Sequence, residues 1–532
     1  MRAIGYVSDE DYLAIPGVAI ELESLANGAV TLLTSSARGA IYSDVSAGRY
    51  RVTLAKDGFG SKWVECELGN EPRMFRLLRD TVAGYMWPKW VRSGEKAEIR
   101  VHSPEQYQLT LWRYGLKKEF VRMLSWFDEH GPRTTVQIAP DCDFTQTGMQ
   151  WNRHGYLFPH VQQFVAAPAE SGLYYLWAKT PSGRSFSFPW VVAPSAPKAK
   201  IAVLASTNTW NAYNNYGGRS NYINPQGLPP TPTVNARLDL DRYTQPEPVW
   251  RFPDEAYKPL SFERPEIVNH NFDNSPWDNR TIEDGIHGRS QCGLAPGEWR
   301  LLGWLEREGF EYDYYAEAQL DDGTLPLDAY KALLISVHPE YWTRQMCKRV
   351  KDWVTRGGQL LYLGGNGVNC EVIYEDDGAM RCLTHDDSGQ AGGHESRMHR
   401  TYEAEAGLLG VVFTHPGVMT SAPYKVLNEF HWLLEGTNLK NGDLFGEKSL
   451  HERVPGGASG HETDKISPSS LNGLEFVAKG TNPDDGGGEV VYGALGEGAI
   501  FSVGSITWVS SLFPDDAVSR ITRNALLRMA YR

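Results

Sequence analysis

Four polar residues follow apolar runs of the sequence: Tyr213, His338, Glu340 and Asn366. In open α/β sheets, ligands bind beyond the carboxyl ends of the strands, so residues that follow buried strands are placed to meet there. Imidazole and carboxylate groups transfer protons or bind metal ions, and a phenol or an amide can hold a substrate. The runs cover residues 201–205, 333–337 and 359–363. The sequence therefore predicts one polar site at the edge of a sheet.

Each of these residues also has an ordinary structural interpretation. A histidine two residues before a glutamate is often a hydrogen-bonded pair that only shapes a loop, which would account for His338 and Glu340. Tyr213 is compatible with a core aromatic whose hydroxyl group is satisfied. Asn366 precedes Gly367 in a dipeptide that favours tight turns. The residue types alone leave both interpretations open.

Other catalytic arrangements are weaker. His394 and His399 frame a sequence similar to a zinc-protease helix motif. They are five residues apart, which places them about 140° apart around a helix rather than on one face. The sequence has no Gly-x-Ser-x-Gly elbow, which disfavours a serine hydrolase. Cys370 lies three residues past Gly367 and not on a strand–helix turn, which disfavours a thiol nucleophile.

The elements that must position these residues fall into three predicted regions. Residues 1–80 alternate apolar and polar positions between turn signals, which is typical of a small β-sandwich. Residues 81–195 show the same pattern and predict a second β-sandwich, followed by a proline-rich linker. From 196 to 532, apolar strands alternate with amphipathic helices such as 341–356. This alternation predicts a doubly wound α/β domain.

Composition limits the partners of the chain. Its 532 residues carry a net charge of −13 without clustered lysine and arginine, which disfavours a nucleic-acid partner. No apolar window approaches the roughly 18 residues of a membrane-spanning helix, and the first residues do not read as a signal peptide, so we expect a cytoplasmic protein. The six cysteines lack CxxC spacing, which favours reduced thiols over disulfides or a thiolate zinc site.

Four phrases of the third region point to one family. TWNAYNNYGGRSNY, AYKPLSFERP, VHPEYW and LYLGGNGV occur in this order and together resemble the catalytic subunit of the N,N-dimethylformamidase family over residues 197–532. The phrase SDVSAGRYRVTLAKDGFG in the first region resembles transthyretin-like regulatory modules. The main resemblance implies a glutamine-amidotransferase-like C-terminal domain that hydrolyses the C–N bond of a small amide. It also implies a single iron ion bound by two tyrosinates and one glutamate.

Carried onto this sequence, the resemblance implies Tyr213, Tyr257 and Glu340 as the iron ligands. Tyr216 and Tyr222 lie in the same loop as Tyr213 and remain alternatives for a tyrosine ligand. Phenolate and carboxylate are hard donors that suit ferric iron better than zinc. Three protein ligands would leave positions open for water and for the amide oxygen.

The resemblance places two further residues beside the iron. We expect His338 to take a proton from the attacking water and pass it to the leaving amine, or else only to orient Glu340 or a tyrosinate. Asn366 would hold the substrate carbonyl or the oxyanion through its amide group, or else only form a turn. A zinc or other metal hydrolase that uses His338, Glu340 and a further histidine such as His394 is the alternative enzyme. A non-catalytic protein that binds a carbohydrate or a partner is the alternative from another class.

The amide itself is left open, with dimethylformamide as one candidate. No segment resembles the small subunit of that family, and the chain is long enough to form several cores. We therefore expect a homo-oligomer that folds and binds iron without a second polypeptide.

Overall fold

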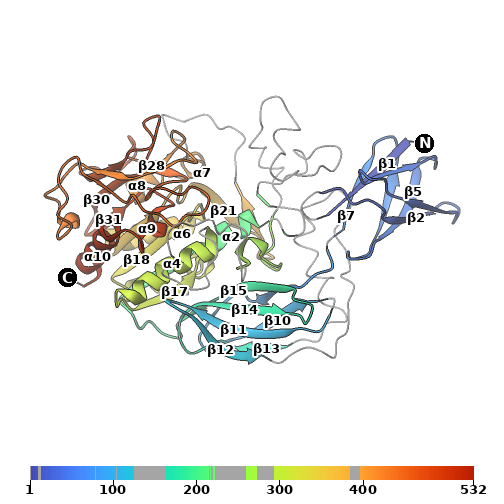
Figure 1. The fold of residues 1–532 in the computed structure, drawn as a ribbon, viewed down its shortest axis with the longest axis horizontal. Helices are drawn as coiled ribbons and strands as arrows, with labels where there is room; N and C mark the ends of the chain where they lie inside the picture. The colour runs from blue at the N-terminus through green and yellow to red at the C-terminus, as the bar shows by residue number, and fades with distance from the viewer. Residues whose placement is uncertain are drawn as a thin grey trace.

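The computed structural model (Figure 1) describes residues 2–9, 13–77, 79–103, 105–124, 163–214, 216, 220–221, 259–271, 293–383 and 396–531. Two β-sandwiches, drawn in blue and in cyan to green in Figure 1, precede an α/β region that runs from green to red. Among the helices of these residues, none is long and apolar enough to cross a membrane.

The N-terminal sandwich forms because its strands alternate buried and exposed side chains. In β5 (Gly48–Ala55), Val52 and Leu54 point into the core while Arg51 and Thr53 face outward. One sheet has the order β4-β1-β7 and the other β3-β2-β5-β6. The remaining bounds are β1 Arg2–Ser8, β2 Ala19–Ser24, β3 Val30–Thr34, β4 Ala40–Ser43, β6 Lys62–Leu68 and β7 Arg73–Arg76.

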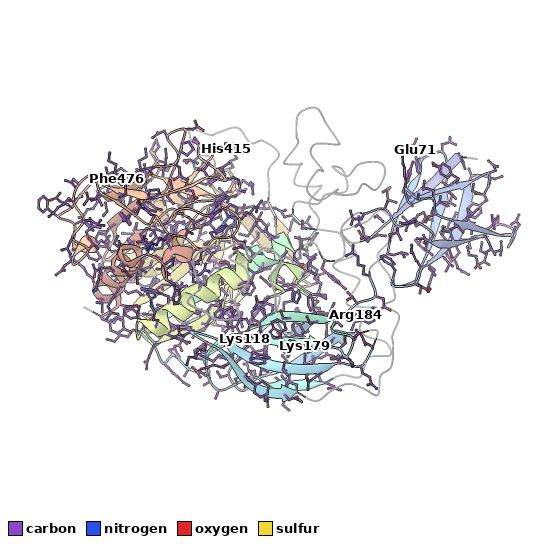
Figure 2. The ribbon with its side chains drawn as sticks, viewed as in Figure 1. Glu71, Lys118, Lys179, Arg184, His415 and Phe476 are labelled. Carbon is purple, nitrogen blue, oxygen red and sulfur yellow. The ribbon has the colours of Figure 1, made fainter. Side chains whose placement is uncertain are left out.

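The second sandwich packs on both sides of its larger sheet. Leu176 and Trp190 point into its own core, whereas Tyr175 and Trp177 belong to the core of the α/β region. Lys118, labelled in Figure 2, places Nζ 3.8 Å from the centre of the Trp177 ring. The sheets have the orders β13-β10-β8 and β12-β11-β14-β15-β9. Their bounds are β8 Ala83–Trp87, β9 Trp90–Arg92, β10 Lys96–His102, β11 Gln108–Tyr114, β12 Lys118–Leu124, β13 Phe164–Ala166, β14 Gly172–Lys179 and β15 Ser185–Ala193.

The α/β region is built on a nine-stranded sheet of order β17-β16-β18-β20-β31-β30-β29-β25-β26. The first five strands are parallel: β17 Tyr312–Ala316, β16 Ile201–Ala205, β18 Ala332–Val337, β20 Gln359–Gly364 and β31 Gly498–Ser502. The other four are antiparallel: β30 Glu489–Leu495, β29 Glu475–Gly480, β25 Tyr424–Val426 and β26 Leu444–Phe445.

Helices cover both faces of the parallel strands, which are buried along their length and nearly all apolar. The helices α4 (Leu294–Arg307), α9 (Trp508–Ser511) and α10 (Asp516–Tyr531) pack on one face. On the other face lie α6 (Arg344–Thr355) and α8 (Ala406–Leu409). The glutamine-amidotransferase-like class of this region stays a prediction.

The predicted helix 341–356 is wrong in its first residues. Tyr341–Trp342 form the short strand β19, which pairs with β21 (Cys370–Tyr374). The helix begins only at Arg344, because the Thr343 side chain accepts the backbone N–H of Met346 and caps it.

Candidate functional site

The parallel order of the sheet brings two of the predicted segments to one edge. Val337, the last residue of β18, pairs with Gly364, the last residue of β20. The residues that follow, His338 and Asn366 among them, therefore leave the sheet side by side. From the neighbouring strand β16 the chain passes through Ser206 into helix α2 (Thr207–Tyr213), which ends in Tyr213.

Helix α2 is fixed at its start by two buried carboxylates rather than by a side-chain cap. Glu298 of α4 accepts the backbone N–H of Ser206 at 3.2 Å and the Trp210 indole N–H at 3.0 Å. Glu317 of α5 (Glu317–Asp321) accepts the backbone N–H of Asn208 at 2.7 Å. Burial raises the pKa of both carboxyl groups, that of Glu298 to about 7, so the hydrogen bonds to the backbone N–H groups, rather than a full negative charge, hold this seven-residue helix.

Tyr213, His338 and Glu340 converge on one point. Tyr213 Oη lies 2.9 Å from His338 Nε2 and donates to Glu340 Oε2 at 3.0 Å. His338 Nε2 lies 3.1 Å from the same carboxylate oxygen. The Glu340 and His338 side chains are only 1% and 8% exposed. The three residues that sequence analysis singled out from two separate segments thus form a closed triangle of oxygen, oxygen and nitrogen atoms.

The tautomer of His338 follows from its second contact. His338 Nδ1 lies 2.9 Å from the carbonyl oxygen of Gly365. A carbonyl can only accept, so Nδ1 carries the hydrogen, and Nε2 is the atom that gains or loses a proton. Burial alone would lower the pKa of His338, but the charge of Glu462 and the contact with Glu340 outweigh it and raise the pKa to about 9.

The two oxygens of Glu340 have different partners. Oε2 faces Tyr213 and His338, while Oε1 accepts from Arg397 Nη1 at 3.2 Å. Burial favours the neutral acid, but the contacts with His338, Arg397 and Tyr213 hold the pKa of Glu340 below its usual value. The backbone N–H of Glu340 donates to Thr209 Oγ1 of α2 at 3.0 Å. Glu340 is therefore an ionised carboxylate locked to the tyrosine-bearing helix.

Asn366 combines a turn conformation with a contact to the site. Its φ of 50° lies in the left-handed region, which asparagine adopts more readily than most residues. Its Nδ2 donates to Glu462 Oε2 at 2.8 Å, and its backbone N–H donates to Asp464 Oδ1 at 2.8 Å. The amide nitrogen that we expected to hold a substrate oxygen is thus used on Glu462. Its Oδ1 is buried and has no hydrogen-bond partner among the described residues.

Sequence reasoning missed three residues of the site. Glu462 Oε2 lies 3.6 Å from His338 Nε2, and Asp464 bonds the Tyr362 hydroxyl group at 2.7 Å. Burial raises the pKa of Asp464 to about 7. Glu462 and Asp464 lie at β28 (Thr463–Lys465), outside the parallel half of the sheet, so no strand-end signal marks them. Arg397 belongs to the motif set aside as zinc-protease-like.

Residues 110–519 match the family described as N,N-dimethylformamidase beta subunit-like, C-terminal. The chain belongs to this family. The N,N-dimethylformamidase beta subunit of Paracoccus aminophilus is 27% identical over 496 residues, which cover 77% of this chain and 62% of the relative. The beta subunit from Alcaligenes sp. is 28% identical over 280 residues, which cover 43% of this chain and 36% of the relative. The chain thus spans about a third to three-fifths of these relatives.

The similarity of this chain to solved structures is too low to support a family assignment. A β-galactosidase from Bacillus circulans sp. alkalophilus is similar at 13% identity over 43% of this chain and 26% of that chain, with a TM-score of 0.26. A TM-score at this level supports no shared fold and no shared function.

The other candidate ligands of the sequence analysis do not lie at the triangle of Tyr213, His338 and Glu340 in the described part of the chain. Tyr257, Tyr222 and His394 lie outside the described residues. Tyr216 packs with Ala83 and Tyr85 of the second sandwich. Within the described ranges, no group of three or more histidine, cysteine, aspartate or glutamate side chains is arranged to hold a metal ion. The zinc alternative depends on His394 and stays a prediction.

The left-handed backbone of Asn366 allows its turn role to be separated from its amide role. Asn366→Gly keeps the turn but deletes the amide, so we expect stability within about 1 kcal/mol of the wild type and a lower kcat. Asn366→Ala should lower kcat similarly and also lose about 1–2 kcal/mol of unfolding free energy, because alanine is strained there. Urea unfolding and steady-state kinetics measure both. Full turnover in the glycine variant would make Asn366 a turn residue only.

Proposed function

We propose that this chain hydrolyses the C–N bond of a small amide, such as a formamide, at a mononuclear ferric ion held by Tyr213, Glu340 and Tyr257. The observation that carries the proposal is the triangle of Tyr213, His338 and Glu340. Family membership supports the same conclusion, because the relatives are named for N,N-dimethylformamidase.

The donor atoms suit such an ion. Tyr213 Oη and Glu340 Oε2 lie 3.0 Å apart. Two donors on one metal ion at about 2 Å are separated by roughly this distance. Both are hard oxygen donors, which favour ferric iron over zinc. When bound, the ion would supply Lewis acidity that polarises the amide carbonyl and lowers the pKa of water.

The protein itself would move the proton. His338 directs Nε2 to the donor triangle and, with a pKa of about 9, holds a proton there near neutral pH that it would give to the leaving amine. Its neutral form, whose share grows as the pH rises toward 9, would take the proton of the attacking water. Glu462, 3.6 Å from Nε2, stabilises the imidazolium. Asn366 holds Glu462 in this position through its amide nitrogen.

Metal analysis of the chain produced alone tests the proposal. We expect about one iron per chain and a coloured protein, because tyrosinate transfers charge into the half-filled d orbitals of ferric iron on absorbing visible light. Elemental analysis, visible absorption and hydrolysis of formamide, N-methylformamide and N,N-dimethylformamide check this, and light scattering gives the oligomeric state. Colourless, iron-free protein that still hydrolyses amides would contradict the iron site. Protein that takes up iron only with a second polypeptide would contradict the expectation that the chain folds and binds iron alone.

A further inference from the structure

Arg264 has no solvent exposure and bonds helix α2, which carries Tyr213. Its guanidinium group makes four described hydrogen bonds, all to neutral oxygens. Nε donates to the Ser261 carbonyl at 3.0 Å and Nη1 to the Tyr216 carbonyl at 3.0 Å. Nη2 donates to the carbonyl and to Oδ1 of Asn211, at 3.0 and 3.1 Å. One side chain thus joins segments that are 53 residues apart in the sequence.

One of the joined segments carries Tyr213, and the other follows Tyr257 in the sequence. Asn211 belongs to α2, two residues before Tyr213. Segment 259–271 begins two residues after Tyr257 and contains Arg264 itself. Two further bonds connect the same pair of segments, from Asn211 Nδ2 to the carbonyl of Leu260 at 3.2 Å and from Asn214 Nδ2 to that of Pro265 at 2.7 Å.

The second β-sandwich holds segment 259–271 from the other side. Lys89 Nζ donates to the Arg264 carbonyl at 2.8 Å and to Glu266 Oε1 at 2.6 Å. The side chains of Lys89 and Glu266 are 7% and 4% exposed. The rings of Trp90 and Phe262 pack edge-to-face, with their centroids 5.2 Å apart. A continuous set of buried contacts therefore runs from the sandwich through Arg264 to α2 and Tyr213.

We propose that Arg264 is a positioning residue that fixes α2, and with it Tyr213, against His338 and Glu340. The second β-sandwich then belongs to the scaffold of the site, because Lys89 anchors the segment that carries Arg264. A planar guanidinium can bond three residues of two segments at fixed angles, whereas a lysine ammonium group on a flexible stem cannot. This proposal rests on the proposed function only for its catalytic readout.

The test compares Arg264→Lys with Arg113→Lys. Arg113 joins the same sandwich to α4 through Glu306 at 2.7 Å, and none of its described bonds reaches α2 or segment 259–271. In the iron-free proteins, hydrogen–deuterium exchange over residues 207–216 should rise in Arg264→Lys and stay at the wild-type level in Arg113→Lys. In the iron-loaded proteins, Arg264→Lys should shift the visible band and lower kcat by about 10²-fold, as expected for a misplacement of about 1 Å.

A second variant keeps the test decisive if Arg264→Lys does not fold. Asn211→Ala deletes the Oδ1 acceptor and the bond to Leu260 while it leaves Arg264 in place. It should raise exchange over residues 207–216 in the same direction. Unchanged exchange in the foldable variant, with an unshifted band and full kcat, would overturn the positioning role. Wild-type protein without iron or amidase activity would instead overturn the proposed function, while the exchange comparison would still decide the role of Arg264.

Discussion

Replacement of Tyr213 by phenylalanine is expected to abolish iron binding, colour and amide hydrolysis together. The change deletes one hydroxyl group, which bonds Glu340 at 3.0 Å and lies 2.9 Å from His338. If Tyr213 were only a core aromatic, loss of these bonds would lower the free energy of unfolding of the protein by only about 1 kcal/mol. If Tyr213 is a ligand, loss of its hydroxyl group would also prevent iron from binding. Elemental iron analysis, visible absorption and kcat on N,N-dimethylformamide separate the two outcomes.

Tyr216→Phe is the matched control for this experiment. Tyr216 lies in the same loop, three residues further on, but packs with Ala83 and Tyr85 of the second sandwich. It should retain iron, colour and turnover. Glu340→Gln should behave like Tyr213→Phe, since it keeps the shape of the side chain but removes the anionic donor. Full iron and activity in Tyr213→Phe, with losses in Tyr216→Phe, would transfer the ligand role to Tyr216.

The pattern of the sequence predicted that the segments after β16, β18 and β20 meet, whereas the choice of Tyr213 within the first segment came from the family resemblance. Apolar runs mark buried parallel strands, and neighbouring parallel strands end at the same edge of the sheet. The residues that follow these strands in the sequence therefore meet there, however far apart they lie in the chain. The helix α6 shows the limit of periodicity. Its apolar face continues through Tyr341 and Trp342, but the Thr343 cap excludes these residues from the helix.

Other parts of the site could not be predicted because they depend on tertiary contacts. Glu462 reaches His338 from a two-stranded ladder in which β28 pairs with β23 (Val412–Thr414), and it follows none of the parallel strands in the sequence. Arg397 was overlooked because the motif around it was judged by helical spacing alone. Arg264 resembles an ordinary surface arginine in the sequence, and only its complete burial shows that it links α2 to segment 259–271.

Removal of the His338 side chain is expected to separate proton transfer from metal binding. His338→Ala should retain iron and colour, because Tyr213 and Glu340 keep their oxygens 3.0 Å apart. Its kcat should fall by roughly 10²–10⁴-fold, the usual loss when a general acid–base group is deleted. Single-turnover kinetics on N,N-dimethylformamide, with iron content measured on the same sample, give both quantities.

Glu462→Gln is the companion variant that tests how His338 works. The substitution keeps a side-chain oxygen for the Asn366 amide but removes the charge that faces His338 Nε2 at 3.6 Å. If His338 carries a proton during turnover, loss of this charge lowers the pKa of His338, so the pH at which kcat rises should move to a lower value while iron content stays constant. Parallel loss of iron and activity in His338→Ala would show instead that His338 only orients Glu340 and Tyr213. In that case Glu462→Gln should leave kcat unchanged, because a neutral, purely orienting imidazole does not need a facing carboxylate.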